Sequence, residues 1–459
     1  MAINSVRLPT LNAKAVARFP LLPWLLVGSA SLAVALGLVV RRYPPSFWLD
    51  QPAAVANSGF CAGMVTDKLP HPMSSVPKPA MGVPFVDPAF GTRVIRITDV
   101  QAETGFVGGR VPMYSTVPAW NADESYLIVF QTHAYSQSGL RSRHLLYDGK
   151  TYQFIRELDI GPADVEHVYW DSKDPDVLYY PFTYEASGRP IRQLVKYHVG
   201  SGQREVLENF ACPGTLDFGH PKYMAWDGSR IGMRCRGRYP AAETFVFDLL
   251  ASRESPRINS PRDIGIQVAP SGKLGMFGSS VIDLSSMTPV RTLKTNPWEH
   301  GTLVPTAGGQ DAFVSVQFDG NYIGTLMLEN LQTGGVREII GKKTGWRSYP
   351  PVTTHISTTA FQARGWVAVS IEGEHAGRNV LDQELVIANV DTGEVCRAAH
   401  HHSRSTSGPR GYWAEPHVVI SPTGTRLMFG SDWGGGTTVD TYIVELPGYT
   451  KGRSRATAK

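Results

Sequence analysis

The sequence predicts an all-β fold, a seven-bladed β-propeller, preceded by one N-terminal transmembrane helix. A unit of short β-rich runs and turns recurs seven times between residues 93 and 448, with the period of about fifty residues that is typical of propeller blades. Glycine (46) and proline (33) are frequent and charged residues make up only 18%, which disfavours helical bundles and coiled coils. Residues 21–40 form an uncharged, largely apolar stretch.

The stretch 21–40 is long enough to span a bilayer, because a transmembrane helix needs about twenty apolar residues. Trp24 near one end and Arg41 and Arg42 at the other are typical interfacial anchors. A cleaved signal peptide is the alternative, although its apolar region is usually shorter and ends close to a small-x-small site. Basic residues are slightly more numerous before the span than after it, which favours a cytoplasmic N-terminus. We therefore expect a single-pass inner-membrane protein with the propeller on the periplasmic side.

Composition divides the chain into five expected parts. They are a short basic segment (1–20), the transmembrane signal anchor (21–40), a linker rich in Pro, Ser and Ala (41–92), the propeller (93–448) and a basic disordered tail (449–459). The net charge of +4 comes from the basic ends, and the body between them is acidic. Nucleic acid is not an expected partner, because its binding needs a basic face on the folded part.

The last unit of the repeat shows the pattern most clearly. A strand from His417 leads into a Ser-Pro-x-Gly turn, a second strand ends near Asp432, and TYIVEL (441–446) forms a third. This unit ends after its third strand, so we expect RVIRITD (93–99) to add the fourth and close the ring without an open edge. An assembly of two-sheet β-sandwiches is the alternative fold.

Histidines recur where the innermost strands are expected to begin. In a propeller these starts surround one axial funnel, so side chains far apart in sequence can meet there. The expected starts are Val117, His167, His220, Gly265, His300, His355 and His417. Neutral imidazole is a common metal ligand and can also act as a general base. The alternative is that these histidines are structural and hydrogen-bond neighbouring strands.

Arginine, histidine and cysteine residues elsewhere in the chain are weaker candidates for a functional or structural role. Arg234 and Arg236 alternate on one strand and would face the same side, where they could bind the carboxylates of an acidic sugar or simply form a solvated strand end. The run His400-His401-His402 is expected to be a solvated loop. Cys212 and Cys235 can pair if the body is periplasmic, whereas Cys61 and Cys396 have no obvious partners.

Two segments carry a resemblance to known propellers. The Ser421-Pro422-x-Gly424 turn with LMFGSDW and TYIVEL resembles the WD40-like repeats of TolB-type propellers. The segments His167…Asp-Pro-Asp-Val-Leu-Tyr-Tyr and Glu415-Pro416-His417 are more particularly similar to oligogalacturonate lyases. That resemblance implies seven blades, β-elimination of uronate oligomers, and a manganese ion held by histidines and a glutamine in the funnel.

The resemblance is not complete. The family has asparagine where His417 stands, and Pro351 to Thr354 replace the glutamine and one histidine expected before His355. His355 is the best match to a metal ligand, and His167 matches a funnel histidine.

We predict an envelope propeller that binds an acidic carbohydrate in a histidine-lined funnel. A manganese-like divalent ion would be held by His300, His355 and His417. His167 or His220 would be the base, with Arg234 or Arg236 on the carboxylate. The alternative is a non-catalytic scaffold that binds other envelope proteins.

Overall fold

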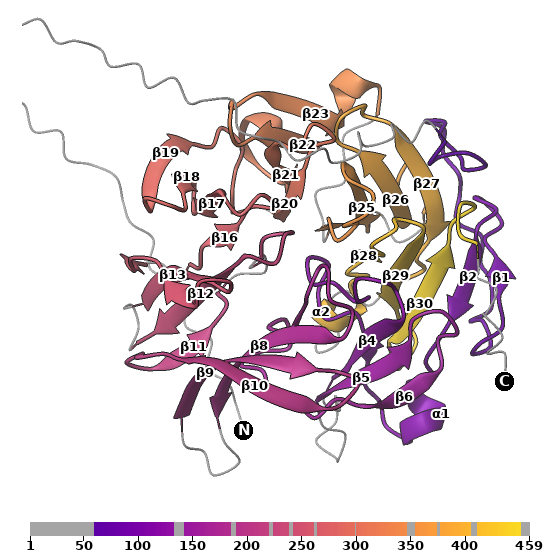
Figure 1. Cartoon of the computed structure of the whole chain (residues 1–459). Coiled ribbons are helices and arrows are strands. Elements are labelled where there is room, and N and C mark those ends of the chain that lie inside the picture. Colours follow the sequence, from indigo (N-terminus) through magenta and orange to yellow (C-terminus); the bar gives the residue numbers. More distant parts are fainter. Residues whose placement is uncertain are drawn as a thin grey trace, which may run out of the picture. The chain divides into compact units, whose positions relative to one another are not determined.

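The computed structural model describes residues 59–132, 142–184, 190–219, 224–237, 242–260, 264–298, 300–346, 354–373, 377–404 and 411–450. Within these ranges no helix has the length and apolar character needed to cross a membrane. The expected span at 21–40 lies outside the described residues, so it stays a prediction. The described chain folds into seven antiparallel sheets set around one axis, as Figure 1 shows.

Each sheet is one blade. In blades 1 to 6 the first strand in the chain lies innermost, and in blade 7 the innermost strand is the one that follows His417. Blade 1 contains β3 (Arg110–Val111), β4 (Tyr126–Gln131), β5 (Arg143–Asp148) and β6 (Phe154–Glu157). Blade 2 contains β7 (Tyr169–Trp170), β8 (Val177–Tyr184), β9 (Pro190–His198) and β10 (Gln203–Asn209). Blade 3 contains β11 (Thr215–Asp217), β12 (Arg230–Arg236), β13 (Ala242–Asp248), β14 (Arg253–Glu254) and β15 (Ile258–Asn259).

The second half of the ring repeats this plan. Blade 4 contains β16 (Gln267–Val268), β17 (Leu274–Phe277), β18 (Ser280–Asp283) and β19 (Thr288–Thr292). Blade 5 contains β20 (Gly301–Pro305), β21 (Asp311–Gln317), β22 (Thr325–Asn330) and β23 (Val336–Ile340). Blade 6 contains β24 (His355–Ser357), β25 (Trp366–Ile371), β26 (Glu384–Asn389) and β27 (Val395–His400).

Blade 7 is assembled from both ends of the propeller sequence. It contains β28 (Val419–Ile420), β29 (Arg426–Ser431), β30 (Asp440–Glu445), β2 (Arg93–Arg96) and β1 (Phe85–Val86). The short helices are α1 (Val100–Thr104), α2 (Gly411–Ala414), η1 (Gly320–Tyr322) and η2 (Lys342–Thr344). Strand β2 pairs antiparallel with β30, with Val94 opposite Val444. The predicted ring closure by residues 93–99 is therefore confirmed.

Apolar side chains hold the blades together from both faces of each sheet. The buried apolar residues form seven clusters among the described residues, and each cluster joins one pair of neighbouring blades. Strand β29 shows the consequence, because all its residues are buried: one face packs on blade 6 and the other on blade 1. Each fully buried aliphatic or aromatic side chain contributes roughly 1.5–3 kcal/mol of transfer free energy.

Residues 59–92, which we call the N-terminal strap, pack against blades 6 and 7, although composition indicated a linker here. Phe60 stacks on Trp366 with ring centroids 4.5 Å apart. Cys61 forms a disulfide with Cys396, although neither cysteine has an obvious partner in the sequence. Arg397, fully buried, donates to the Leu69 carbonyl at 2.6 Å. The strap thus covers the outer edge of blade 6.

Two inner strands begin elsewhere than expected. Blade 1 was expected to begin at Val117, but its ladder begins with β3 and resumes with a single bridge between Trp120 and Leu127. Blade 3 was expected to begin at His220, but β11 lies before that residue, and a bridge between Met224 and Ile231 follows. Both inner strands are interrupted, which a pattern search for one continuous run does not detect.

Candidate functional site

Three of the predicted histidines meet at one end of the central opening. His300 directly precedes β20, His355 is the first residue of β24, and His417 lies just before β28. The ring centroids of His300 and His355 are 4.4 Å apart, and those of His355 and His417 are 4.3 Å apart. They meet because the innermost strands of blades 5, 6 and 7 are neighbours and begin at the same end of the ring.

Glu415 joins this group, although sequence reasoning did not single it out as a ligand. One carboxylate oxygen, Oε2, lies 3.4 Å from His355 Nε2 and 3.5 Å from His417 Nε2. The ligand atoms of these three residues all lie within 4.8 Å of one another. Two imidazole nitrogens and one carboxylate oxygen form a donor set that suits manganese, zinc or iron, so the residues present fit a divalent ion.

His417 has an energetically unfavourable backbone conformation and environment. It is 0% exposed, its backbone φ is +42°, and its Nδ1 has no hydrogen-bond partner among the described residues. Burial lowers the pKa of His417, because the charged imidazolium is poorly solvated there, and the Glu415 carboxylate partly opposes this shift. The imidazole is therefore neutral near pH 7, which is the form that binds a metal. Strained non-glycine backbone of this kind is concentrated at functional sites.

The neighbouring His300 is fixed in one tautomer. Its Nδ1 lies 2.6 Å from the carbonyl oxygen of Thr354, which can only accept, so Nδ1 carries the proton. The lone pair of Nε2 then remains available on the other side of the ring. A second contact that orients an imidazole in this way is typical of metal-binding histidines.

Aromatic side chains surround the histidines. The Tyr114 ring lies 5.5 Å from His355 and 5.2 Å from His417, and the Tyr412 ring lies 4.7 Å from His417. Burial raises the pKa of the Tyr114 hydroxyl well above its ordinary value. Tyr114 is therefore a neutral phenol at the physiological pH.

The second ring, Tyr412 on α2, is linked to blade 2. Its hydroxyl donates a hydrogen bond of 2.5 Å to Oε1 of Glu166, which lies in the loop before β7. Burial raises the pKa of Glu166 to about 7, although the Tyr412 hydrogen bond opposes that shift. Glu166 was not singled out in the sequence, where only its neighbour His167 carried a signal.

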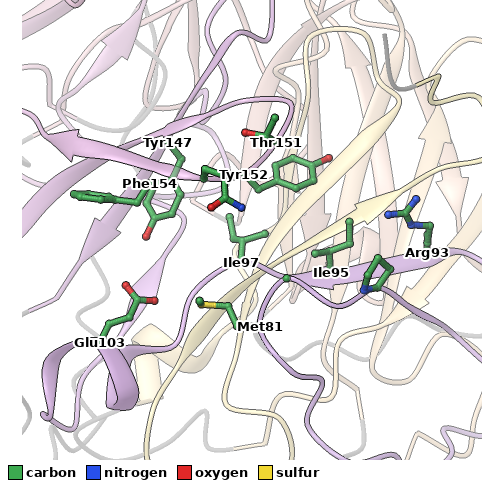
Figure 2. A pocket seen from close by; sticks show the side chains of 12 residues that line it. Met81, Arg93, Ile95, Ile97, Glu103, Tyr147, Thr151, Tyr152 and Phe154 are labelled. Atoms are coloured by element: carbon green, nitrogen blue, oxygen red, sulfur yellow. The ribbon is translucent and has the colours of Figure 1, made fainter. Parts of the chain in front are cut away.

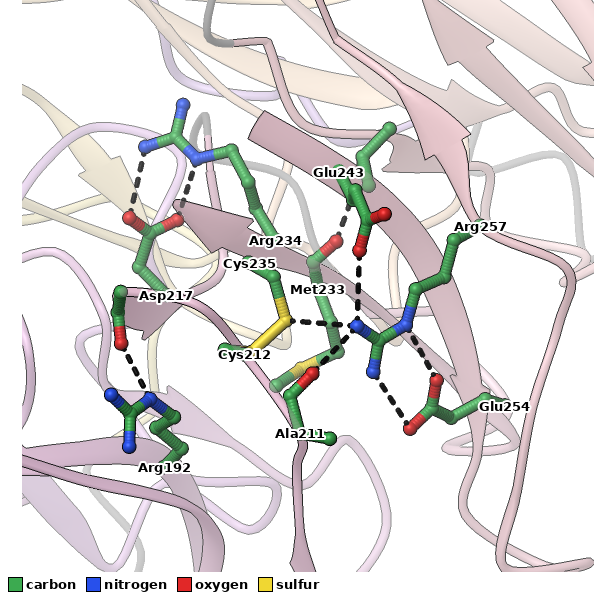
Figure 3. The surroundings of a disulfide bond; sticks show 12 residues. Arg192, Ala211, Cys212, Asp217, Met233, Arg234, Cys235, Glu243, Glu254 and Arg257 are labelled. Atoms are coloured by element: carbon green, nitrogen blue, oxygen red, sulfur yellow. Dashed lines mark hydrogen bonds and ion pairs between the residues drawn. A yellow bond between two sulfur atoms is a disulfide. The ribbon is translucent and has the colours of Figure 1, made fainter. Parts of the chain in front are cut away.

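A second polar cluster lies between blades 2 and 3. Arg234 donates from Nε and Nη2 to the two oxygens of Asp217, at 2.8 and 3.0 Å (Figure 3). Arg236 Nε lies 3.4 Å from the same carboxylate, so both arginines face one side as expected. The His167 ring packs 5.7 Å from Phe218. Burial lowers the pKa of His167, and the Asp217 charge partly opposes this.

The other expectations have mixed outcomes. His220 lies outside the described residues, so its role stays a prediction. The expectation that His400-His401-His402 is a solvated loop is wrong, because all three side chains are buried. Strand β27 runs through His400, and the strap covers the chain here, with the Asp87 carboxylate accepting from the His400 backbone N–H. The possible Cys212–Cys235 disulfide is present (Figure 3).

A separate cavity lies at the outer seam between blades 7 and 1, away from the histidines. It has a volume of about 280 Å³, and its lining mixes apolar and aromatic side chains such as Ile95 and the exposed Phe154 with charged ones such as Arg93 and Glu103 (Figure 2). None of the histidines described above lines it.

Comparison with known proteins concerns the fold. No family model matches the sequence, and no curated protein matches it. An oligogalacturonate lyase solved in complex with manganese is similar in structure, with a TM-score of 0.56, 16% identity, and coverage of 80% of this chain and 96% of that one. The oligogalacturonate lyase of Vibrio parahaemolyticus has the same score and coverage with 14% identity.

TolB from Acinetobacter baumannii gives a TM-score of 0.37 with 13% identity, covering 76% of this chain and 67% of that one, which is too distant to carry an argument. The chain therefore shares the seven-bladed propeller fold of the oligogalacturonate lyases.

Proposed function

We propose that the protein is an envelope propeller whose funnel binds a divalent metal ion and an acidic oligosaccharide, which it cleaves by β-elimination. The observation that carries this proposal is the convergence of His355, Glu415 and His417 around one point. These three residues would hold the ion, and His300 stacks on His355 beside them. The fold shared with oligogalacturonate lyases, one of them a manganese complex, supports the same proposal.

The chemistry needs two things of the funnel. A bound cation would neutralise the carboxylate next to C5 of the sugar and so make the C5 proton more acidic. A base must then remove that proton, and His167 suits this role because burial keeps its imidazole neutral. Arg234 and Arg236 would add positive charge at the same mouth, although Asp217 already binds both guanidinium groups.

Two disulfides support a location outside the cytoplasm. Cys61–Cys396 and Cys212–Cys235 account for all four cysteines of the chain. Structural disulfides form and persist mainly in oxidising compartments such as the periplasm. Together with the apolar stretch at 21–40, they support a propeller that is tethered to the inner membrane and faces the periplasm.

A scaffold for envelope proteins is the second candidate. The cavity between blades 7 and 1 favours it, because Met81 and Phe154 at its edge are 48% and 54% exposed. Exposed apolar and aromatic side chains around a cavity are typical of protein-binding surfaces.

Metal stoichiometry and an elimination assay test the proposal together. The full-length protein, incubated with Mn²⁺ and freed of excess ion, should retain one ion per chain by elemental analysis. His355→Ala should lose it, whereas His198→Ala on the outer part of blade 2 should retain it. Oligogalacturonate should give products with the ultraviolet absorbance of an unsaturated uronate. A wild-type protein without bound metal would refute the proposal, and metal without such products would refute the lyase reaction.

A further inference from the structure

Tyr412 and Glu166 connect two parts of the funnel that the sequence treats separately. Tyr412 belongs to α2, between blades 6 and 7, and its ring packs on His417. Glu166 precedes β7 in blade 2, and its neighbour in the chain is His167. The 2.5 Å hydrogen bond between the two side chains therefore connects the loop before blade 2 with the segment that precedes blade 7.

The two side chains differ from an ordinary structural pair in their exposure. Tyr412 is 42% exposed, and its hydrogen bond to Glu166 is exposed as well, so a bound molecule can reach it. Tyr114, which also contacts His417, is buried. Glu166 is partly buried. The described charged and titratable groups that act on the pair are Asp164 beside Glu166, and Tyr114 and Glu415 near Tyr412. No described cation is paired with Glu166, and the hydrogen bond from Tyr412 stabilises its charged form.

We propose that Glu166 and Tyr412 form a proton-donor pair, in which Tyr412 passes a proton from Glu166 to an oxygen atom of a ligand held at the His355–Glu415–His417 centre. The inference takes that centre and the identity of the ligand, a uronate oligomer, from the proposed function. Glu166 is the group that titrates, and it contacts none of the three metal-ligand candidates in the described structure. Tyr412 is the group that would touch the ligand.

The proton balance of an elimination fits this pair. The base takes the C5 proton, the C5–H electron pair forms the C4=C5 double bond, and the C4–O4 bond breaks. The leaving O4 takes a proton from the Tyr412 hydroxyl, while Glu166 in its carboxylic acid form returns one to the phenol oxygen. The base then releases its proton to solvent and Glu166 takes one up, so no water or redox partner is consumed.

The pH dependence follows from the partly buried position of Glu166. The acid form is the active one, and the raised pKa of about 7 keeps a substantial fraction of Glu166 protonated at neutral pH. An ordinary glutamic acid, with a pKa of about 4.3, would be almost fully ionised there. Turnover should therefore decline as the pH rises through about 7.

Two conservative variants test the pair in the full-length protein. Tyr412→Phe keeps the ring on His417 but removes the hydroxyl group, and Glu166→Gln keeps the shape but cannot transfer a proton. Tyr322→Phe in η1 and Glu394→Gln in the turn after β26 are the matched controls. We expect both site variants to lower kcat by about 10²-fold or more with a small effect on KM. Glu166→Gln should also abolish the decline in rate near pH 7, and the controls should match the wild type.

A second measurement does not depend on turnover. The side-chain carboxyl resonances of ¹³C-labelled glutamate are titrated, and the Glu166 signal is assigned by its absence from Glu166→Gln. Its midpoint should lie near 7 and rise in Tyr412→Phe, because the phenol stabilises the carboxylate. Zn²⁺ at the histidine centre should lower that midpoint in the wild type and have no effect in His355→Ala.

The outcomes separate this inference from the proposed function. A Glu166 titration midpoint in the ordinary range for glutamate, or one that does not change when Zn²⁺ binds, overturns the inference even if the protein is a lyase. Site variants that turn over like the controls also overturn it. A responsive Glu166 without elimination supports the proton-donor pair and refutes the lyase reaction. A protein that binds no metal refutes both.

Discussion

Removing the Cys61–Cys396 disulfide should destabilise the propeller more than removing Cys212–Cys235. The two bonds differ mainly in the loops that they close, with sequence separations of 335 and 23 residues. The chain-entropy model assigns about 6 kcal/mol to the longer loop and about 3.4 kcal/mol to the shorter one at 25 °C. We therefore predict that loss of the two disulfides differs by about 2 kcal/mol in its effect on the free energy of unfolding.

The comparison uses three variants of the full-length protein. They are Cys61→Ala with Cys396→Ala, Cys212→Ala with Cys235→Ala, and all four substitutions together. Urea unfolding followed by circular dichroism gives the free energy of unfolding of each, and wild type in reductant should behave like the fourfold variant. Alanine removes little packing at either site, because each sulfur is small.

Equal losses for the two pairs, or a greater loss for Cys212–Cys235, would refute the reasoning. Either result would mean that the strap stays in place through its other contacts, such as the stacking of Phe60 on Trp366 and the Arg397 hydrogen bond to Leu69. The loss of entropy that each disulfide imposes on the unfolded chain would then not determine which variant is less stable.

Three further predictions concern buried groups, each measured by urea unfolding. Arg426 Nη2 binds the Glu124 carboxylate at 2.5 Å, so Arg426→Met leaves a buried charge without its ion-pair partner and should lower the free energy of unfolding by about 3–5 kcal/mol. Adding Glu124→Gln should restore much of that stability, and a double variant no more stable than the single one would contradict the prediction. Burial lowers the pKa of His402 to about 4. Below about pH 6.5 the unfolded chain therefore binds more protons than the folded one, and the free energy of unfolding should fall as the pH drops toward 4. His402→Phe should show a shallower fall, and an unchanged pH dependence would mean that other groups cause it. Ile443→Ala creates a cavity at a buried position between blades 7 and 1 and should lower the free energy of unfolding by about 2–5 kcal/mol. A loss of stability below about 1 kcal/mol would indicate that this interface between blades is loosely packed.

The repeat and its closure could be predicted because both depend on local patterns. Turns such as Ser421-Pro422-x-Gly424 mark the strand ends, and the incomplete last unit leaves an obvious vacancy for residues 93–99. The meeting of His300, His355 and His417 followed from the same regularity, since corresponding strand starts surround one axis. Irregular inner strands in blades 1 and 3 did not follow, because they interrupt the pattern.

Pairings outside the repeat could not be predicted. No spacing rule links Cys61 to Cys396, and the strap lacks the alternation of a blade strand. Glu415 stood in a recognised segment, but an acidic residue two positions before a histidine is common and does not by itself indicate a ligand. Glu166 is recognised as a functional candidate only from its hydrogen bond to Tyr412, because no local sequence pattern indicates burial or a contact between distant blades.

Closure by β2 also bears on how the polypeptide reaches its native state. Arg93 to Arg96 leave the ribosome long before their partner β30, which lies about 350 residues later in the chain. Such a distant pairing must wait for the loop between them to close, which is entropically slow. The open edges of early blades therefore stay available for misassembly until β30 has been synthesised, so a chain that stops before Asp440 should remain dependent on chaperones.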